Sequence, residues 1–196
     1  MAKIEDGKGR GFYSGVDSTG RLQTASATIS EEILATVEGE AYAFGTATVS
    51  FTSSTNSAIL YVKNNDSRPL ILDRCRVMLG YATGGTPGTW FISFRRNPTA
   101  GTIISNALTS GLTNINHGSN ITPDATYYRG VQGDTLTGGS GGSFPIATTV
   151  SQTTFPFGRV LQTGSSFGIT LTPPTGTTAA DVFIVLRAYY PQAQLK

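Results

Sequence analysis

The segment Asp181-Val182-Phe183-Ile184-Val185-Leu186-Arg187-Ala188-Tyr189-Tyr190 decides the fold class of this chain. Its apolar side chains recur at every second position, which is the pattern of a β-strand with one buried face. A similar segment, Ser166 to Thr172, comes before it, and the turn-forming residues Pro173-Pro174-Thr175-Gly176 separate the two. This part of the chain therefore predicts neighbouring strands of a β-sheet.

Comparable short segments recur along the chain, each bounded by Gly, Pro, Asn, Asp, Ser or Thr. They are residues 42–51, 57–63, 70–81, 90–96, 158–162, 167–172 and 181–190, with a weaker segment at 127–131. Only the residues from Ser30 to Ala35 favour a helix, with Ser30 as N-cap, acidic residues in the first turn and Gly39 as the stop. The sequence predicts an all-β sandwich of antiparallel sheets.

The segment 70–81 is expected to have one apolar face and one face that carries Arg74 and Arg76. The apolar face comprises Ile71, Cys75, Val77, Leu79 and Tyr81. Cys75 is then a small core side chain and not a nucleophile. Asp73 falls on the apolar face, so we expect it at a frayed strand end, paired with an arginine, or at a β-bulge.

Residues 1–38 differ from the rest, and we expect them to form an N-terminal arm before a sandwich domain at 39–196. Charged residues and glycines crowd the first eleven positions, and Phe12 and Tyr13 follow. Such a segment cannot bury itself. It is either a disordered terminus or an arm that orders on a neighbouring subunit, and we favour the arm.

Residues 97–156 form a long, loop-rich excursion with only three charged residues, Asp124, Arg129 and Asp134. Its apolar residues predict packing over the sandwich or against another subunit, whereas the Gly-Ser run at 137–143 is interpreted as flexible backbone. The candidate interface residues, including two from the arm, are Phe12, Tyr13, Ile103, Ile104, Leu108, Leu112, Tyr127, Tyr128 and Phe144.

The composition favours protein contacts over ionic ones. Charged residues make up 13% of the chain, and the net charge is +2, against a usual charged share of about 25%. We therefore expect no nucleic-acid partner. The longest strongly apolar run, Val182 to Leu186, is too short to span a bilayer, and the start has no apolar signal region. We expect a soluble protein made in a cytoplasm, without membrane contact.

Catalytic and metal chemistry are not predicted. The single histidine, His117, lies in a polar loop, and the single cysteine, Cys75, has no matching partner nearby. One histidine cannot supply a transition-metal site. The segment 90–96 combines aromatic and basic residues, as proteins that bind single-stranded nucleic acid do. Trp90, Ile92 and Phe94 share one face of the expected strand, however, which favours a row of core side chains. We expect no enzyme activity, no cofactor and no metal.

Four segments resemble the jelly-roll head decoration, or cement, proteins of tailed bacteriophages. They are Gly15 to Leu22, Gly39 to Ala43, Ala58 to Asn65 and Leu161 to Ile169, followed by a last strand that ends in two tyrosines. The resemblance covers most of the chain outside the excursion 97–156, which departs from a minimal jelly roll.

The resemblance implies a jelly roll of two four-stranded sheets, assembled as a homotrimer on the capsid exterior of a virion. There it would bridge neighbouring copies of the major capsid protein and stabilise the head. The alternative is a receptor- or carbohydrate-binding head of a trimeric phage fibre, which exposed Trp90, Tyr127 and Tyr128 would serve. No shaft repeat precedes the sandwich, and we therefore favour the decoration protein.

Overall fold

The structure is a computed structural model that describes residues 14–16, 22–24, 30–81, 88–105, 108–109, 111–146 and 152–191. The chain divides into two units, Met1–Ser30 and Glu31–Lys196. In the first unit, β1 (Ser14–Val16) and β2 (Leu22–Thr24) form an antiparallel pair. Residues 31–38 of the predicted arm, which contain its helix, belong to the second unit.

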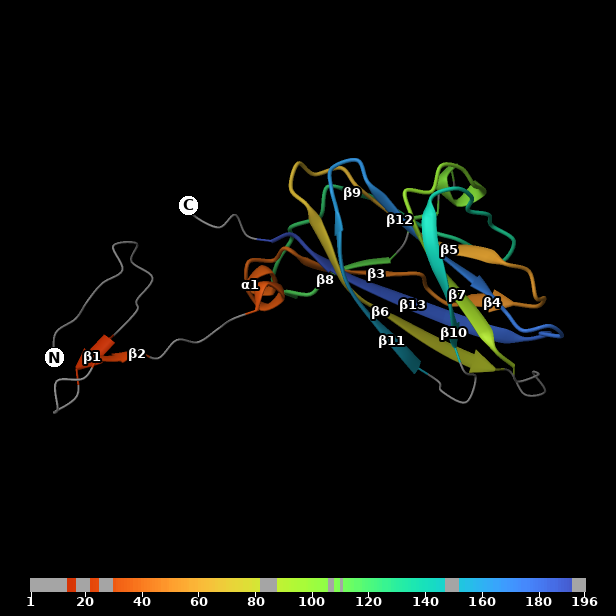
Figure 1. The fold of residues 1–196 in the computed structure, drawn as a ribbon, viewed down its shortest axis with the longest axis horizontal. Coiled ribbons are helices and arrows are strands. Elements are labelled where there is room, and N and C mark those ends of the chain that lie inside the picture. The colour runs from red at the N-terminus through yellow and green to blue at the C-terminus, as the bar shows by residue number, and fades with distance from the viewer. Residues whose placement is uncertain are drawn as a thin grey trace. The chain divides into compact units, whose positions relative to one another are not determined.

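The second unit is built almost entirely of strands (Figure 1). Its elements are α1 (Glu31–Val37), β3 (Ala41–Gly45), β4 (Val49–Phe51), β5 (Ser57–Asn64), β6 (Leu70–Tyr81), β7 (Trp90–Arg96), the 3₁₀ helix η1 (Thr102–Ser105), β8 (Gly111–Asn114), β9 (Ala125–Arg129), β10 (Ser140–Ile146), β11 (Gln152–Leu161), β12 (Ser166–Thr172) and β13 (Ala180–Tyr189). All strand pairings are antiparallel.

The strand pairing is that of a jelly roll. β3 pairs with β13, β5 with β12, β6 with β11 and β7 with β10, so the chain is one long hairpin whose two arms are paired from end to end. The further pairs β6–β13 and β7–β12 join these ribbons into two sheets. The sheet orders are β11-β6-β13-β3-β8 and β10-β7-β12-β5-β9. The predicted all-β sandwich is confirmed, and the jelly-roll topology follows from the pairing itself.

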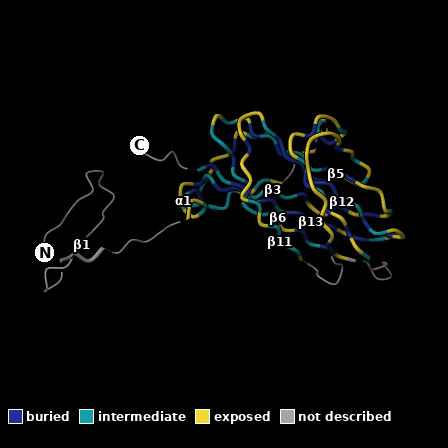
Figure 2. Tube along the Cα trace, in the orientation of Figure 1, coloured by how far each residue is buried: buried dark blue, intermediate teal, exposed yellow. Residues whose placement is uncertain are grey.

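The core lies between the two sheets and is apolar. Trp90, Ile92 and Phe94 of β7 are all buried, as the sequence predicts. Cys75 is also buried, which raises the pKa of its thiol. Figure 2 shows that the buried residues follow the strands, whereas exposed residues gather mainly in the connections.

Strand β6 contains the irregularity that Asp73 suggested. Its register with both β11 and β13 shifts between Leu72 and Arg74, and Asp73 is hydrogen-bonded to the guanidinium of Arg74. Because of this register shift, the side chains of Leu70 and Leu72 point into the core, whereas Ile71 is half-buried. The expected inward position of Ile71 is therefore wrong, because the bulge reverses the alternation at that end of the strand.

The excursion 97–156 contains β8, β9, β10 and the start of β11. The interpretation of the Gly-Ser run as flexible is wrong from Ser140 onward, since those residues form β10 beside β7. Glycine is required there: a Cβ on Gly141 would lie 2.0 Å from the carbonyl oxygen of Phe94. Pairing with β7, and not a side-chain pattern, makes this segment a strand.

Candidate interaction surface

The predicted interface residues fall into different environments. Phe12 and Tyr13 lie outside the described residues. Ile103 is fully buried in a small cluster on the outer side of β5, and Ile104 and Tyr128 pack against that cluster. The ring of Tyr128 stacks on Tyr61 at 6.2 Å between centroids. These side chains hold the excursion onto its own sandwich.

Leu112 and Tyr127 close one lateral edge of the sandwich. β8 extends one sheet beside β3, and β9 extends the other beside β5. Leu112 of β8 and Tyr127 of β9 pack against the main core, and the ring of Tyr127 lies 5.3 Å from that of Phe44. The excursion therefore covers this edge with apolar side chains from within the chain.

The opposite lateral edge carries a cluster of aromatic side chains. It is formed by β10 and β11, which end the two sheets in the described part of the chain. Phe144 of β10 and Phe155 and Phe157 of β11 gather there around the buried Phe94, with ring centroids 5.6, 5.3 and 4.6 Å from it. Phe144 is 41% exposed and Val160 of β11 is 42% exposed. We call Phe144, Phe155 and Phe157 the aromatic edge.

The aromatic edge is flanked by arginines. The guanidinium of Arg159 lies over the ring of Phe157, 5.8 Å from its centroid. Arg96 and Arg159 line a cavity of about 410 Å³ that continues from the edge to Phe167. Neither arginine forms an ion pair with a carboxylate of the described residues. This edge is thus apolar at its centre and basic at its border.

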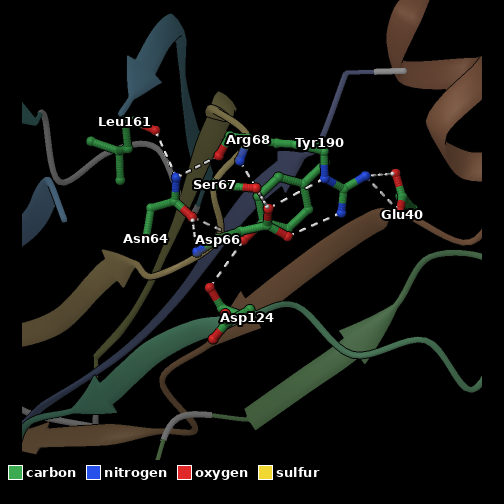
Figure 3. A network of polar contacts seen from close by, with 8 residues as sticks. All are labelled: Glu40, Asn64, Asp66, Ser67, Arg68, Asp124, Leu161 and Tyr190. Carbon is green, nitrogen blue, oxygen red and sulfur yellow. Dashed lines mark hydrogen bonds and ion pairs between the residues drawn. The ribbon is translucent and has the colours of Figure 1, made fainter. Parts of the chain in front are cut away.

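A polar network locks the end of the sandwich beside α1 (Figure 3). The side-chain amide of Asn64 donates to the carbonyl oxygens of Arg68 and Leu161, at 2.8 and 3.0 Å. Its Oδ1 accepts from the hydroxyl of Tyr190 at 3.1 Å and from the backbone N–H of Asp66 at 3.1 Å. One buried amide therefore joins β5, β11 and the end of β13.

Arg68 connects this network to the residues before β3. It donates to both carboxylate oxygens of Glu40, at 2.8 and 2.7 Å, and to Asp66 at 3.0 Å. Hydrogen bonds from Arg68 lower the pKa of Asp66, and burial raises the pKa of the Tyr190 phenol. The guanidinium also lies over the Tyr190 ring, 4.8 Å from its centroid. These interactions fix the corner of the fold.

Two residues of the aromatic edge, Phe155 and Phe157, were not predicted from the sequence. Phe155 and Phe157 lie outside the strand expected at 158–162, and the structure places both in β11. Their spacing of two residues was the signal that could have found them, since it places both rings on one face of a strand. Trp90 was offered as an exposed ring for a sugar, and this is wrong because Trp90 is fully buried.

His117 lies in an exposed turn, as predicted. Among the residues that the structure describes, no three His, Cys, Asp or Glu side chains are grouped to hold a metal ion. Within the same ranges, no helix is long and apolar enough to cross a membrane.

No protein-family model matches the sequence, and no curated protein matches it. Solved structures of viral particles show a remote likeness. A chain of the heated full particle of Israeli acute paralysis virus is 8% identical, with 98% of this chain and 80% of that chain covered and a TM-score of 0.31. A Tomato Aspermy Virus chain is 10% identical, with 88% and 86% covered and a TM-score of 0.25. A chain of an expanded equine rhinitis A virus particle is 10% identical, with 100% and 98% covered and a TM-score of 0.26. The fold assignment rests on the strand pairing of this chain.

Proposed function

We propose that this protein is a virion structural protein that decorates the outer surface of a capsid. In this role it is made in the cytoplasm of the host, assembles as a homotrimer and binds neighbouring copies of the major capsid protein. Bridging between capsid subunits stabilises the head against separation of those subunits. The proposal takes its partner and location from the resemblance of the sequence to phage cement proteins.

The observation that carries the proposal is the exposure of large apolar side chains on the terminal strands β10 and β11. The edge at β10 and β11 leaves Phe144 and Val160 substantially exposed. Exposed apolar side chains bordered by polar residues are typical of protein-contact surfaces. This supports a protein whose task is to bind other protein subunits.

The low charge of the chain supports the same conclusion. With 13% charged residues, few charges need to be desolvated when large areas of this surface meet another protein. Many modest contacts, repeated by the symmetry of an assembly, then add up to firm attachment.

The test is to mix the purified protein with capsids that lack it and to measure co-sedimentation. The proposal expects saturable binding and capsids that withstand a higher temperature before they open. A heat-unfolded sample of the same protein is the control and is expected not to bind. Folded protein that never sediments with capsids would contradict the proposal.

A further inference from the structure

Helix α1 presents an apolar surface to the outside. Ala35 on its inner side is fully buried, whereas Ile33 is 55% exposed and Val37 is 70% exposed. A spacing of four residues places Ile33 and Val37 on the same face of the helix. Ile121 lies beside the end of the helix and is 47% exposed. We call Ile33, Val37 and Ile121 the helix face.

The helix face and the aromatic edge have opposite charge. Glu31 and Glu38 at the two ends of α1 are exposed, and neither forms an ion pair with a cation of the described residues. Arg96 and Arg159 border the aromatic edge in the same unpaired state. The two surfaces are therefore complementary in charge, and both are apolar at their centres.

We propose that the helix face of one protomer docks on the aromatic edge of a second copy of this chain. The helix face cannot reach the aromatic edge of its own protomer. α1 packs on β3 and β13, two elements on the other side of β6 from β11, and its apolar face is turned away from them. A contact between these surfaces thus requires another molecule. It goes beyond the proposed function, which specifies no surface for contact between copies.

Docking by a helix fits this edge better than pairing with an added strand. Pro145 lies in β10 and Pro156 lies in β11. Each proline removes a backbone N–H donor, and prolines in edge strands are a known protection against strand addition. The side chains of the aromatic edge remain available, so contact through side chains is the favoured mode.

The contact joins two different surfaces, so it is heterologous. Repetition of such a contact either closes a ring of copies or produces an open chain. Each protomer in a closed ring offers its helix face to one neighbour and its aromatic edge to the other. A cyclic homotrimer satisfies this geometry.

The test combines two variants that damage opposite sides of the contact. Val37→Asp puts a charge on the helix face, and Phe144→Asp puts one on the aromatic edge. Light scattering should show that the wild type is an assembly and that each variant alone is a monomer. Mixed together, the two variants should form a particle of two copies and no more, because each keeps the surface that the other lost.

Leu108→Asp is the matched control, since Leu108 is 37% exposed in the excursion but lies on neither surface. It should assemble as the wild type does. Arg159→Glu is a second edge variant for the case that Phe144→Asp unfolds, which circular dichroism would show, because Arg159 lies over the ring of Phe157 and is exposed. A monomeric wild type, or variants that assemble unmixed, would overturn the proposal. A monomeric wild type would also contradict the proposed homotrimer, whereas binding to capsids is measured separately by co-sedimentation.

Discussion

At the scale of the residue, Asn64 makes the most demanding contribution to the fold. Its buried amide forms four hydrogen bonds in the polar network at the end of the sandwich beside α1, which we call the corner network. In Asn64→Ala the N–H of Asp66 and the hydroxyl of Tyr190 keep their bonds to the carbonyl oxygen of Asp124, whereas the carbonyl oxygens of Arg68 and Leu161 lose the amide donor. A buried polar group left unpaired costs about 1 to 3 kcal/mol. We expect the free energy of unfolding to fall by at least this amount, measured by urea denaturation.

The neighbouring Asn65 is the control for that change. Its side chain is exposed and bonds only the hydroxyl of Thr126, whereas its backbone N–H keeps its bond to Asp124 in any variant. Asn65→Ala should shift the free energy of unfolding by no more than about 0.5 kcal/mol. Equal losses for the two variants would show that the corner network contributes nothing specific.

Asp66 makes the same corner sensitive to acid. Its hydrogen bonds from Arg68 lower its pKa in the folded protein below the ordinary 3.8. A lowered folded pKa adds stability that is fully present above the unfolded pKa and is lost as the pH falls through the folded pKa. Asp66→Asn should be less stable at neutral pH and should lose less stability on acidification than the wild type. If the unfolding free energies of the wild type and of Asp66→Asn changed with pH by the same amount, this prediction would be wrong.

At the scale of the element, β8 and β9 are expected to be part of the protomer's own stability. Leu112 packs against the main core from β8, so Leu112→Asp buries an uncompensated charge and should lower the free energy of unfolding by at least about 2 kcal/mol. Leu108→Asp, at an exposed position of the same excursion, should leave it nearly unchanged. Thermal unfolding of both variants distinguishes this from a purely intermolecular role for Leu112.

The N-terminal segment is expected to act in binding. We expect a variant that lacks residues 1–20 to keep the sandwich folded, because α1 with its buried Ala35 and the pair Glu32–Arg74 remain. Binding to capsids or to other copies should become weaker, as co-sedimentation and light scattering would measure. A truncated chain that fails to fold would show that the segment is an intrinsic part of the sandwich.

The strands that could be predicted are the short apolar segments between turn-forming residues. β6, β7 and β13 lie close to their predicted ranges because their buried and less buried side chains alternate. β5 and β12 also lie close to theirs, although both of their faces are buried almost throughout. β8 and β10 gave no such signal. The four residues of β8 are too few for a period, and Gly141 and Gly142 in β10 have no side chains to alternate. Their place in the fold depends on partners that are distant in the sequence.

At the scale of the whole molecule, the interaction surface was harder to predict than the fold. Phe144 and Ile103 were both predicted as interface residues, and Phe144 is 41% exposed whereas Ile103 is buried within the protomer. Both belong to the same apolar, charge-poor excursion, and only the three-dimensional packing separates them. The aromatic edge is assembled from β10 and β11, whose side chains meet because two sheets end on the same side. The sequence of either strand alone does not predict that contact.

The most direct test of the account is the copy number of this chain in virus particles produced from the genome that encodes it. Particles purified through a density gradient would be analysed by quantitative mass spectrometry, with and without prior protease treatment of the intact particles. The account predicts a fixed ratio to the major capsid protein, and loss of this chain when the particle exterior is digested. A chain that is absent from the particles, or present only inside them, would contradict it.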